Sequence, residues 1–234
     1  MNRKLTATLL ILAAILANLG FTALGGVFNY PDVLKEPAGE VLASFRAHES
    51  AVSVWFLVLA LASALLVPIA IGVGRLSTKR AMRFAVPVGI AAAVVQVIGL
   101  LRWPILVPGY AADAASSNPG IASSARDSFT TASDILGTAI GETVGYLLTA
   151  TWTVLVIVAL GRRYAGRWFQ VLGGVAAALV LVGVLSPLGL PVIDTANFFG
   201  YVLWSLWLIV FGIVLVVRER RSAAATPARA AVMS

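Results

Sequence analysis

The chain has 234 residues, of which 60% are hydrophobic and 12% are charged. Soluble globular domains carry about 25% charged residues, so this composition excludes an ordinary soluble domain and indicates a membrane protein. The absence of cysteine excludes disulfides, thiolate catalysis and cysteine-ligated metals.

Six apolar stretches are each long enough to cross a hydrocarbon core of about 30 Å. In chain order they cover residues 5–28, 51–74, 84–107, 135–160, 168–190 and 198–217. They predict an all-α fold, an integral membrane bundle of six transmembrane helices in one domain over residues 1–221. The segment 108–130 is rich in alanine and serine, with a turn signal at Asn118-Pro119-Gly120, and we expect an exported loop there. Residues 222–234 are expected to form a disordered cytoplasmic tail.

Most basic residues flank the spans on one side of this arrangement. They are Arg3, Lys4, Arg75, Lys79, Arg80, Arg83, Arg162, Arg163, Arg167, Arg218, Arg220, Arg221 and Arg229. Because positively charged loops stay in the cytoplasm, both termini are predicted to be cytoplasmic, in a multi-pass protein of the bacterial cytoplasmic (inner) membrane. The formal charge of +7 therefore reflects topology, and nucleic acid is not predicted as a partner.

The fourth span carries the residue that is hardest to explain by packing. Glu142 lies inside an apolar helix, where Asp, Lys or Arg costs on the order of 2.5–3.5 kcal/mol on insertion scales, so an intramembrane charge is a candidate for a functional site. Spacings of three or four place it on one helix face with Thr131, Asp134, Thr138, Tyr146, Thr149 and Thr153. On another face Gly137, Gly141 and Gly145 recur every four residues and predict close packing against a neighbouring helix.

Other spans place polar groups at a matching depth. Arg102 and Glu142 both fall in the exported half of the bilayer, where they could form a pair. Further polar and aromatic residues toward that side are Asn18, Glu49, Trp103, Asp194, Asn197, Tyr201 and Trp204. We therefore expect a pocket that opens to the exported side, above an apolar cytoplasmic half. The alternative is that these groups form interhelical hydrogen bonds and one Arg–Glu pair that hold the bundle together.

Several of these residues also have a simpler interpretation. Arg102 can snorkel to the interface instead of binding a carboxylate or a ligand anion. Asp194 can cap the sixth span, and Glu49 can be solvated at the membrane surface. Trp103 and Trp204 suit an aromatic belt.

The residue inventory restricts the chemistry. One histidine and no cysteine argue against metal and haem sites, so no metal or cofactor is predicted. No phosphate-binding loop or nucleophile elbow occurs in the sequence. The chemistry that remains is proton transfer by a carboxyl group.

Four short segments, Asn18-Leu-Gly-Phe-Thr22, Phe45-Arg-Ala-His-Glu49, Leu101-Arg-Trp-Pro104 and Gly141-Glu142, resemble a family of bacterial six-span membrane proteins of unknown function. That resemblance covers nearly the whole chain and implies a fold but no activity. More weakly, the chain is similar to membrane-bound terpene cyclases of the fungal meroterpenoid type and their bacterial counterparts, which are metal-free helical bundles that protonate an olefin or epoxide with acidic residues. The cyclase pattern has an acid near the start of the second span and another near the last, which would fall on Glu49 and Asp194. The fungal proteins usually have seven spans, whereas six are predicted here.

We therefore predict a metal-independent membrane enzyme that cyclises an isoprenoid or a similar amphipathic lipid by acid initiation. Glu142, Glu49 or Asp194 would donate the proton, and another carboxylate or Tyr146 would accept the final one. The residues expected to bind the substrate are Arg102, Trp103, Asn18, Asp134, Asn197, Tyr201 and Trp204. The alternatives are a proton-coupled transporter or ligand-binding membrane protein, and a non-catalytic scaffold or regulator. The sequence does not indicate an oligomeric state.

Overall fold

The computed structural model describes residues 2–232, except for the side chains of residues 163 and 220–232. Across the described residues the chain forms helices and turns, without a strand. Within them, six helical segments are long and apolar enough to cross a membrane: Arg3–Phe28, Glu49–Gly74, Arg80–Asp113, Pro119–Leu160, Arg167–Leu188 and Pro191–Glu219. The predicted all-α bundle of six membrane-spanning helices is confirmed.

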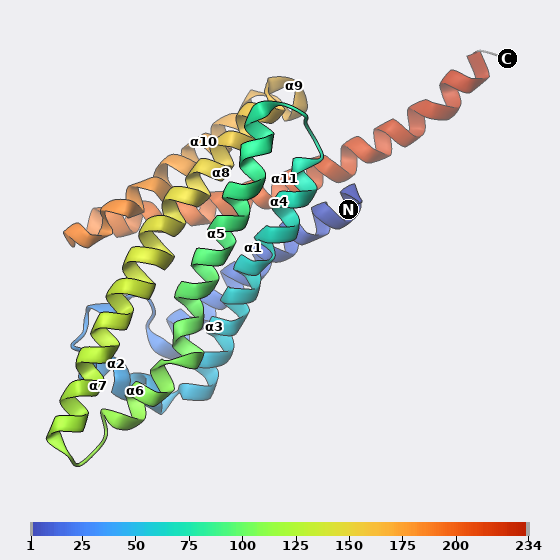
Figure 1. The fold of residues 1–234 in the computed structure, drawn as a ribbon. Coiled ribbons are helices and arrows are strands. Elements are labelled where there is room, and N and C mark those ends of the chain that lie inside the picture. The colour runs from blue at the N-terminus through green and yellow to red at the C-terminus, as the bar shows by residue number, and fades with distance from the viewer. Residues whose placement is uncertain (1, 233–234) are drawn as a thin grey trace.

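Most of the spans consist of more than one helical element (Figure 1). The first span is α1 (Arg3–Phe28), and the second combines α3 (Glu49–Ala64) with α4 (Leu66–Gly74). The third combines α5 (Arg80–Ile105) with α6 (Val107–Asp113). The fourth joins α7 (Pro119–Ala132), the π-helix η2 (Ser133–Val144) and α8 (Gly145–Leu160). The fifth consists of α10 (Arg167–Val182) and η3 (Gly183–Leu188), and the sixth is α11 (Pro191–Val232). The connecting elements are η1 (Asp32–Lys35), α2 (Ala38–Ala47) and α9 (Arg162–Ala165).

The predicted loop over residues 108–130 is wrong, because most of this segment is helical in α6 and α7. Alanine favours helix, and the turn signal marks a helix start. Asn118 is the N-cap of α7, its side-chain oxygen accepts a hydrogen bond of 2.9 Å from the Gly120 N–H, and Pro119 occupies the first turn.

The C-terminal tail was predicted to be disordered. The backbone of α11 continues to Val232, but the side chains of residues 220–232 lie outside the described residues. Disorder of the tail stays a prediction.

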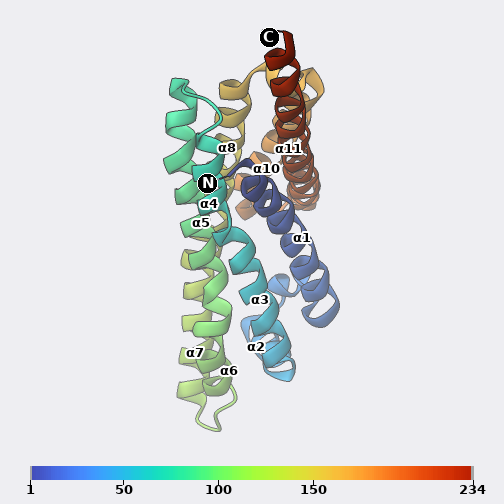
Figure 2. The same cartoon turned by 90° about the vertical axis from the view of Figure 1, so that its right-hand side faces the viewer.

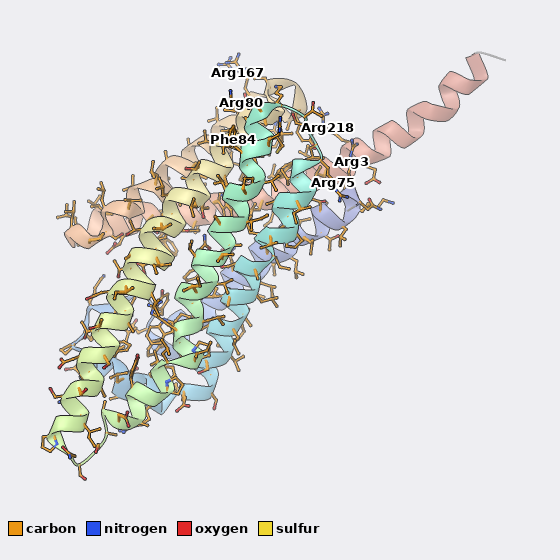
Figure 3. All side chains as sticks on the ribbon, in the orientation of Figure 1. Arg3, Arg75, Arg80, Phe84, Arg167 and Arg218 are labelled. Carbon is orange, nitrogen blue, oxygen red and sulfur yellow. The ribbon has the colours of Figure 1, made fainter. Side chains whose placement is uncertain are left out.

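The spans form a bundle in which α5 runs beside α8 and η2, and α1 lies against α3 and α11 (Figures 1 and 2). Both ends of the chain, the α4–α5 turn and α9 lie toward one end of the bundle, whereas α2, α6 and α7 lie at the other. The labelled arginines Arg3, Arg75, Arg80, Arg167 and Arg218 gather toward the first end, which we call the basic end (Figure 3). Its predicted cytoplasmic orientation stays a prediction.

Two apolar clusters fill the bundle at different heights. The first apolar cluster lies toward the basic end, and its largest side chains are Leu10, Ile69, Trp152, Phe169, Trp207 and Phe211. The second apolar cluster lies toward the opposite end, and its largest side chains are Phe28, Phe45, Phe56, Trp103 and Phe129. The predicted apolar half is therefore present, but a second apolar region lies beyond the polar residues.

Candidate functional site

Polar side chains gather where the two apolar clusters meet. Along α5, the last buried residue of the first apolar cluster is Ala93, and the first residue that packs against the second apolar cluster is Leu100. Gln96 lies between them. We call the following residues the polar layer: Tyr30, Ser63, Gln96, Arg102, Glu142, Tyr146, Thr149 and Tyr201. They come from four of the spans and from the turn after α1.

Glu142 lies in η2, the π-helical part of the fourth span. Its side chain is partly buried, and its carboxyl group makes no hydrogen bond or ion pair with another described residue. It does interact electrostatically with Arg102 and Asp194. Neither carboxyl oxygen is therefore engaged by a hydrogen bond or ion pair within the described residues.

Arg102 reaches the same region from the last turn of α5. Only 7% of the residue is exposed, one guanidinium nitrogen donates to the Gly99 carbonyl, and Cζ lies 5.3 Å from the centre of the Trp103 ring. Its Nε is buried without a hydrogen-bond partner. The predicted Arg102–Glu142 proximity is present as an electrostatic interaction, but between these two described residues no ion pair forms within 4.0 Å.

Gly137, Gly141 and Gly145 of the fourth span pack against α5, as their spacing predicts. A Cβ at Gly141 would lie 3.1 Å from the Gly99 Cα, so the two backbones are in close contact. A Cβ at Gly137 would lie 2.7 Å from the Arg102 Nη2, and one at Gly145 would lie 3.2 Å from the Gln96 Cγ. The glycines therefore make room for two polar side chains of α5.

Three tyrosines surround Glu142. The rings of Tyr146 and Tyr201 meet edge to face, with centroids 5.7 Å apart, and both residues interact electrostatically with Glu142. Tyr30 follows α1 and was not among the predicted site residues, although its place at the end of a span is typical of interfacial tyrosines. Burial, followed by the Glu142 charge, raises the pKa of Tyr30 to about 12, and Arg102 acts in the opposite direction.

The start of the sixth span borders this group. Asp194 is partly buried and interacts electrostatically with Glu142. Asn197 is 8% exposed and donates a hydrogen bond of 2.9 Å to the Val180 carbonyl. Gly183 permits this contact, because a Cβ there would overlap the Asn197 side chain. Asn197 therefore holds the fifth and sixth spans together beside Tyr146.

A hydrogen-bonded chain crosses the bundle in the polar layer. The Ser63 hydroxyl donates to the Gln96 Oε1 at 3.3 Å, and the Gln96 Nε2 donates to the Thr149 hydroxyl at 2.7 Å. Thr149 also interacts with Tyr201, so the chain joins four spans. Ser63 and Gln96 were missed from the sequence, although Gln96 is the one polar side chain between Phe84 and Leu101 and could have been noticed for that reason.

Thr149 and Thr153, which were predicted to share a polar face with Glu142, are fully buried. The Trp204 indole donates a hydrogen bond of 2.8 Å to the Thr153 hydroxyl. This contact places Trp204 at the basic-end side of the polar layer, next to Tyr201, with ring centroids 6.2 Å apart.

Four predicted site residues lie elsewhere. Asn18 and Asp134 are exposed, and the Asn18 amide donates to the Ala14 carbonyl of its own helix at 2.7 Å. Glu49 is exposed at the first position of α3. Trp103 is fully buried in the second apolar cluster, where its ring stacks on Phe56 with centroids 4.7 Å apart. Trp103 borders the polar layer through Arg102 and through Tyr30, whose ring meets the Trp103 ring edge to face with centroids 6.5 Å apart.

Across the described residues, no group of three or more His, Asp or Glu side chains is placed to hold a metal ion. The polar layer itself offers one carboxyl group, one buried guanidinium, an amide and several hydroxyls. These groups can bind a polar head and transfer protons.

The fold and the polar layer define a polytopic helical membrane protein with a functional-site candidate in its interior. The family model described as "Domain of unknown function (DUF4386)" matches residues 5–212, and the chain belongs to this family. The predicted membership of a six-span family of unknown function is thereby confirmed. No curated protein and no solved structure matches the chain, and the resemblance to terpene cyclases has no support from these comparisons.

Proposed function

We propose that the protein is a metal-independent membrane enzyme in which Glu142 transfers a proton to an isoprenoid or a similar amphipathic lipid. One observation carries the proposal: a partly buried carboxyl group without a hydrogen bond or ion pair to another described residue lies in a polar layer between two apolar clusters. An apolar chain can contact the clusters while its reacting group reaches Glu142. Glu142 is preferred to Glu49 as the donor because Glu49 is exposed at a helix start.

The proposed reaction is an isomerisation whose atoms and electrons balance without a further reactant. Glu142 in its acid form gives its proton to the CH carbon of a trisubstituted alkene, which leaves a tertiary carbocation on the other carbon. The electron pair of a second alkene closes a carbon–carbon bond to that cation. Loss of a proton from the new cation to the Asp194 carboxylate forms an alkene, and proton return from Asp194 through water restores Glu142. The faces of Tyr146 and Tyr201 would stabilise the cation.

The experiment uses purified protein in lipid nanodiscs with geranylgeraniol and geranylgeranoic acid as probes. We expect a product of unchanged mass with fewer double bonds, detected by gas chromatography with mass spectrometry. Glu142→Gln should abolish it, whereas Glu49→Gln, the matched control, should retain it. An equally active Glu142→Gln protein that unfolds like wild type would disprove the assigned role.

A ligand-binding protein without turnover is the other function that this geometry supports. It would bind the same probes and release them unchanged. Transport is less well supported, because the first apolar cluster separates the polar layer from the basic end.

A further inference from the structure

The guanidinium of Arg102 is a buried positive charge whose hydrogen-bonding capacity is largely unused. A guanidinium has five N–H donors, yet its bond to the described part of the chain is the one to the Gly99 carbonyl. Its Nε is buried without a partner, and Glu142 lies beyond ion-pair distance. Because buried charges in membrane helices are almost always paired, the unused donors of Arg102 are suited to an anionic ligand.

The surroundings of Arg102 are built to hold the guanidinium in place. On one side lies Gly137, where even a methyl group would come within 2.7 Å of Nη2. On the other side lies Trp103, which is fixed by stacking on Phe56. Arg102 is therefore unable to snorkel freely, and its planar donors have a defined direction, which is the property that favours two-point binding of a carboxylate or phosphate.

The depth of Arg102 in the bilayer indicates which kind of anion can reach it. Arg102 lies 22 residues after the start of α5 at Arg80, which corresponds to about 33 Å along the helix. A hydrocarbon core is about 30 Å thick, so the guanidinium lies near its far boundary, at the level of lipid head groups. Between this level and the basic end, α5 exposes the apolar side chains of Ile98, Val94 and Phe84, which a lipid chain can contact.

We propose that Arg102, with Tyr30 beside it, binds the acidic head of an amphipathic lipid, a carboxylate or a phosphate monoester. The reaction of that lipid rests on the proposed function of Glu142, whereas the binding itself does not. Arg102 would therefore favour lipids with an acidic head over lipids with a neutral head as substrates of this site.

The test compares three probes that share one chain and differ in the head: geranylgeranoic acid, geranylgeranyl monophosphate and geranylgeraniol. Equilibrium binding is measured with radiolabelled probes on protein in nanodiscs, after subtraction of uptake by empty nanodiscs. The variants are Arg102→Gln, Gly137→Ala and Arg46→Gln; Arg46 is exposed on α2 and serves as the matched control. Inorganic phosphate is added as a competitor, to distinguish a lipid head from a free anion.

We expect the acid or the monophosphate to bind at least about tenfold more tightly than the alcohol, because only the acidic heads form charge-assisted hydrogen bonds with the guanidinium. Arg102→Gln should remove this preference and Gly137→Ala should reduce it, with Arg46→Gln unchanged and millimolar phosphate without effect. The proposal is overturned if the alcohol binds as tightly as both acidic probes, or if Arg102→Gln retains the preference. Displacement of the probes by phosphate would overturn the lipid source and show a free-anion site.

The unfolding free energy of the ligand-free variants distinguishes a ligand-binding role of Arg102 from a structural one. If the role of Arg102 is to bind a ligand, Arg102→Gln removes a buried charge that forms no ion pair with the described residues. The ligand-free variant should then be at least as stable as wild type. If Arg102 is instead a structural counter-ion, the variant should be markedly less stable, and that result contradicts the proposal. Tight, acid-selective binding without turnover would refute only the proposed enzymatic function. Turnover confined to the alcohol would refute only the proposed binding of an acidic head by Arg102.

Discussion

The contact between Gly99 and Gly141 gives a prediction whose size follows from the structure. In Gly99→Ala the new Cβ would lie 2.8 Å from the Gly141 Cα and 3.0 Å from the Leu136 carbonyl oxygen. Both obstacles are backbone atoms, so the helices have to separate. Overpacking costs about 1–3 kcal/mol, and the rigid obstacle places this case near the upper value. Alanine recovers about 1 kcal/mol through helix propensity, so the net loss of unfolding free energy should be about 2 kcal/mol.

The assay is reversible unfolding in mixed micelles, with the denaturing detergent as titrant and tryptophan fluorescence as the signal. The matched control is Gly26→Ala, because Gly26 lies in α1 and a Cβ there meets no atom within 4 Å. That variant should be as stable as wild type or more stable by up to about 1 kcal/mol. A Gly99→Ala protein with an unfolding free energy equal to that of Gly26→Ala would refute the close packing of α5 on η2.

Three further predictions concern stability and can be measured in the same assay. Trp103→Ala should lower the unfolding free energy by about 3–5 kcal/mol, because the ring is the centre of the second apolar cluster; a loss below about 1 kcal/mol would contradict that role. Thr149→Val removes the acceptor of the Gln96 amide and should cost about 1 kcal/mol, and no loss would mean that the amide finds another partner. The pKa of Tyr30 is raised from 10.0 to about 12, so the folded state binds more protons than the unfolded state between these pH values, and stability should fall as pH rises through them. Tyr30→Phe should remove this part of the alkaline loss, and an unchanged pH profile would show that Tyr30 does not titrate as a buried group.

The spans could be predicted because the bilayer imposes a length and a composition on each of them. The glycine contacts could also be predicted, since spacing by four brings small residues to one helix face. The proximity of Arg102 and Glu142 followed from their depths, because an α-helix rises by about 1.5 Å per residue. Each of these inferences needs only the length, the residue spacing or the rise of a single helix.

What the sequence did not predict depends on how helices rotate against each other. Span helices here are apolar on most sides, so the pattern does not say which side faces the bundle and which faces lipid. Asn18 and Asp134 were consequently expected in the site and are exposed, whereas Ser63 and Gln96 were overlooked and pair across the bundle. Tyr30 belongs to a turn, where periodicity carries no information.

The π-helix η2 explains both the failure of the predicted polar face and the geometry of the site. Glycines of the fourth span oppose α5 residues in three pairs, which are separated by two steps: Gly137 with Arg102, Gly141 with Gly99, and Gly145 with Gln96. Each step covers three residues on α5, or about 4.5 Å, but four residues on the fourth span, which would be about 6 Å in an α-helix. A π-helix bonds residue i to i+5 and packs more residues into each turn, so it shortens the four-residue step toward that of α5. The same change of period removes the α-helical relation between Asp134 and Glu142, which leaves Asp134 exposed and Glu142 partly buried beside Arg102. Because the π conformation is confined to residues 133–144, the irregular backbone lies where Glu142 and Arg102 meet, and such π-helical turns are frequent at functional sites.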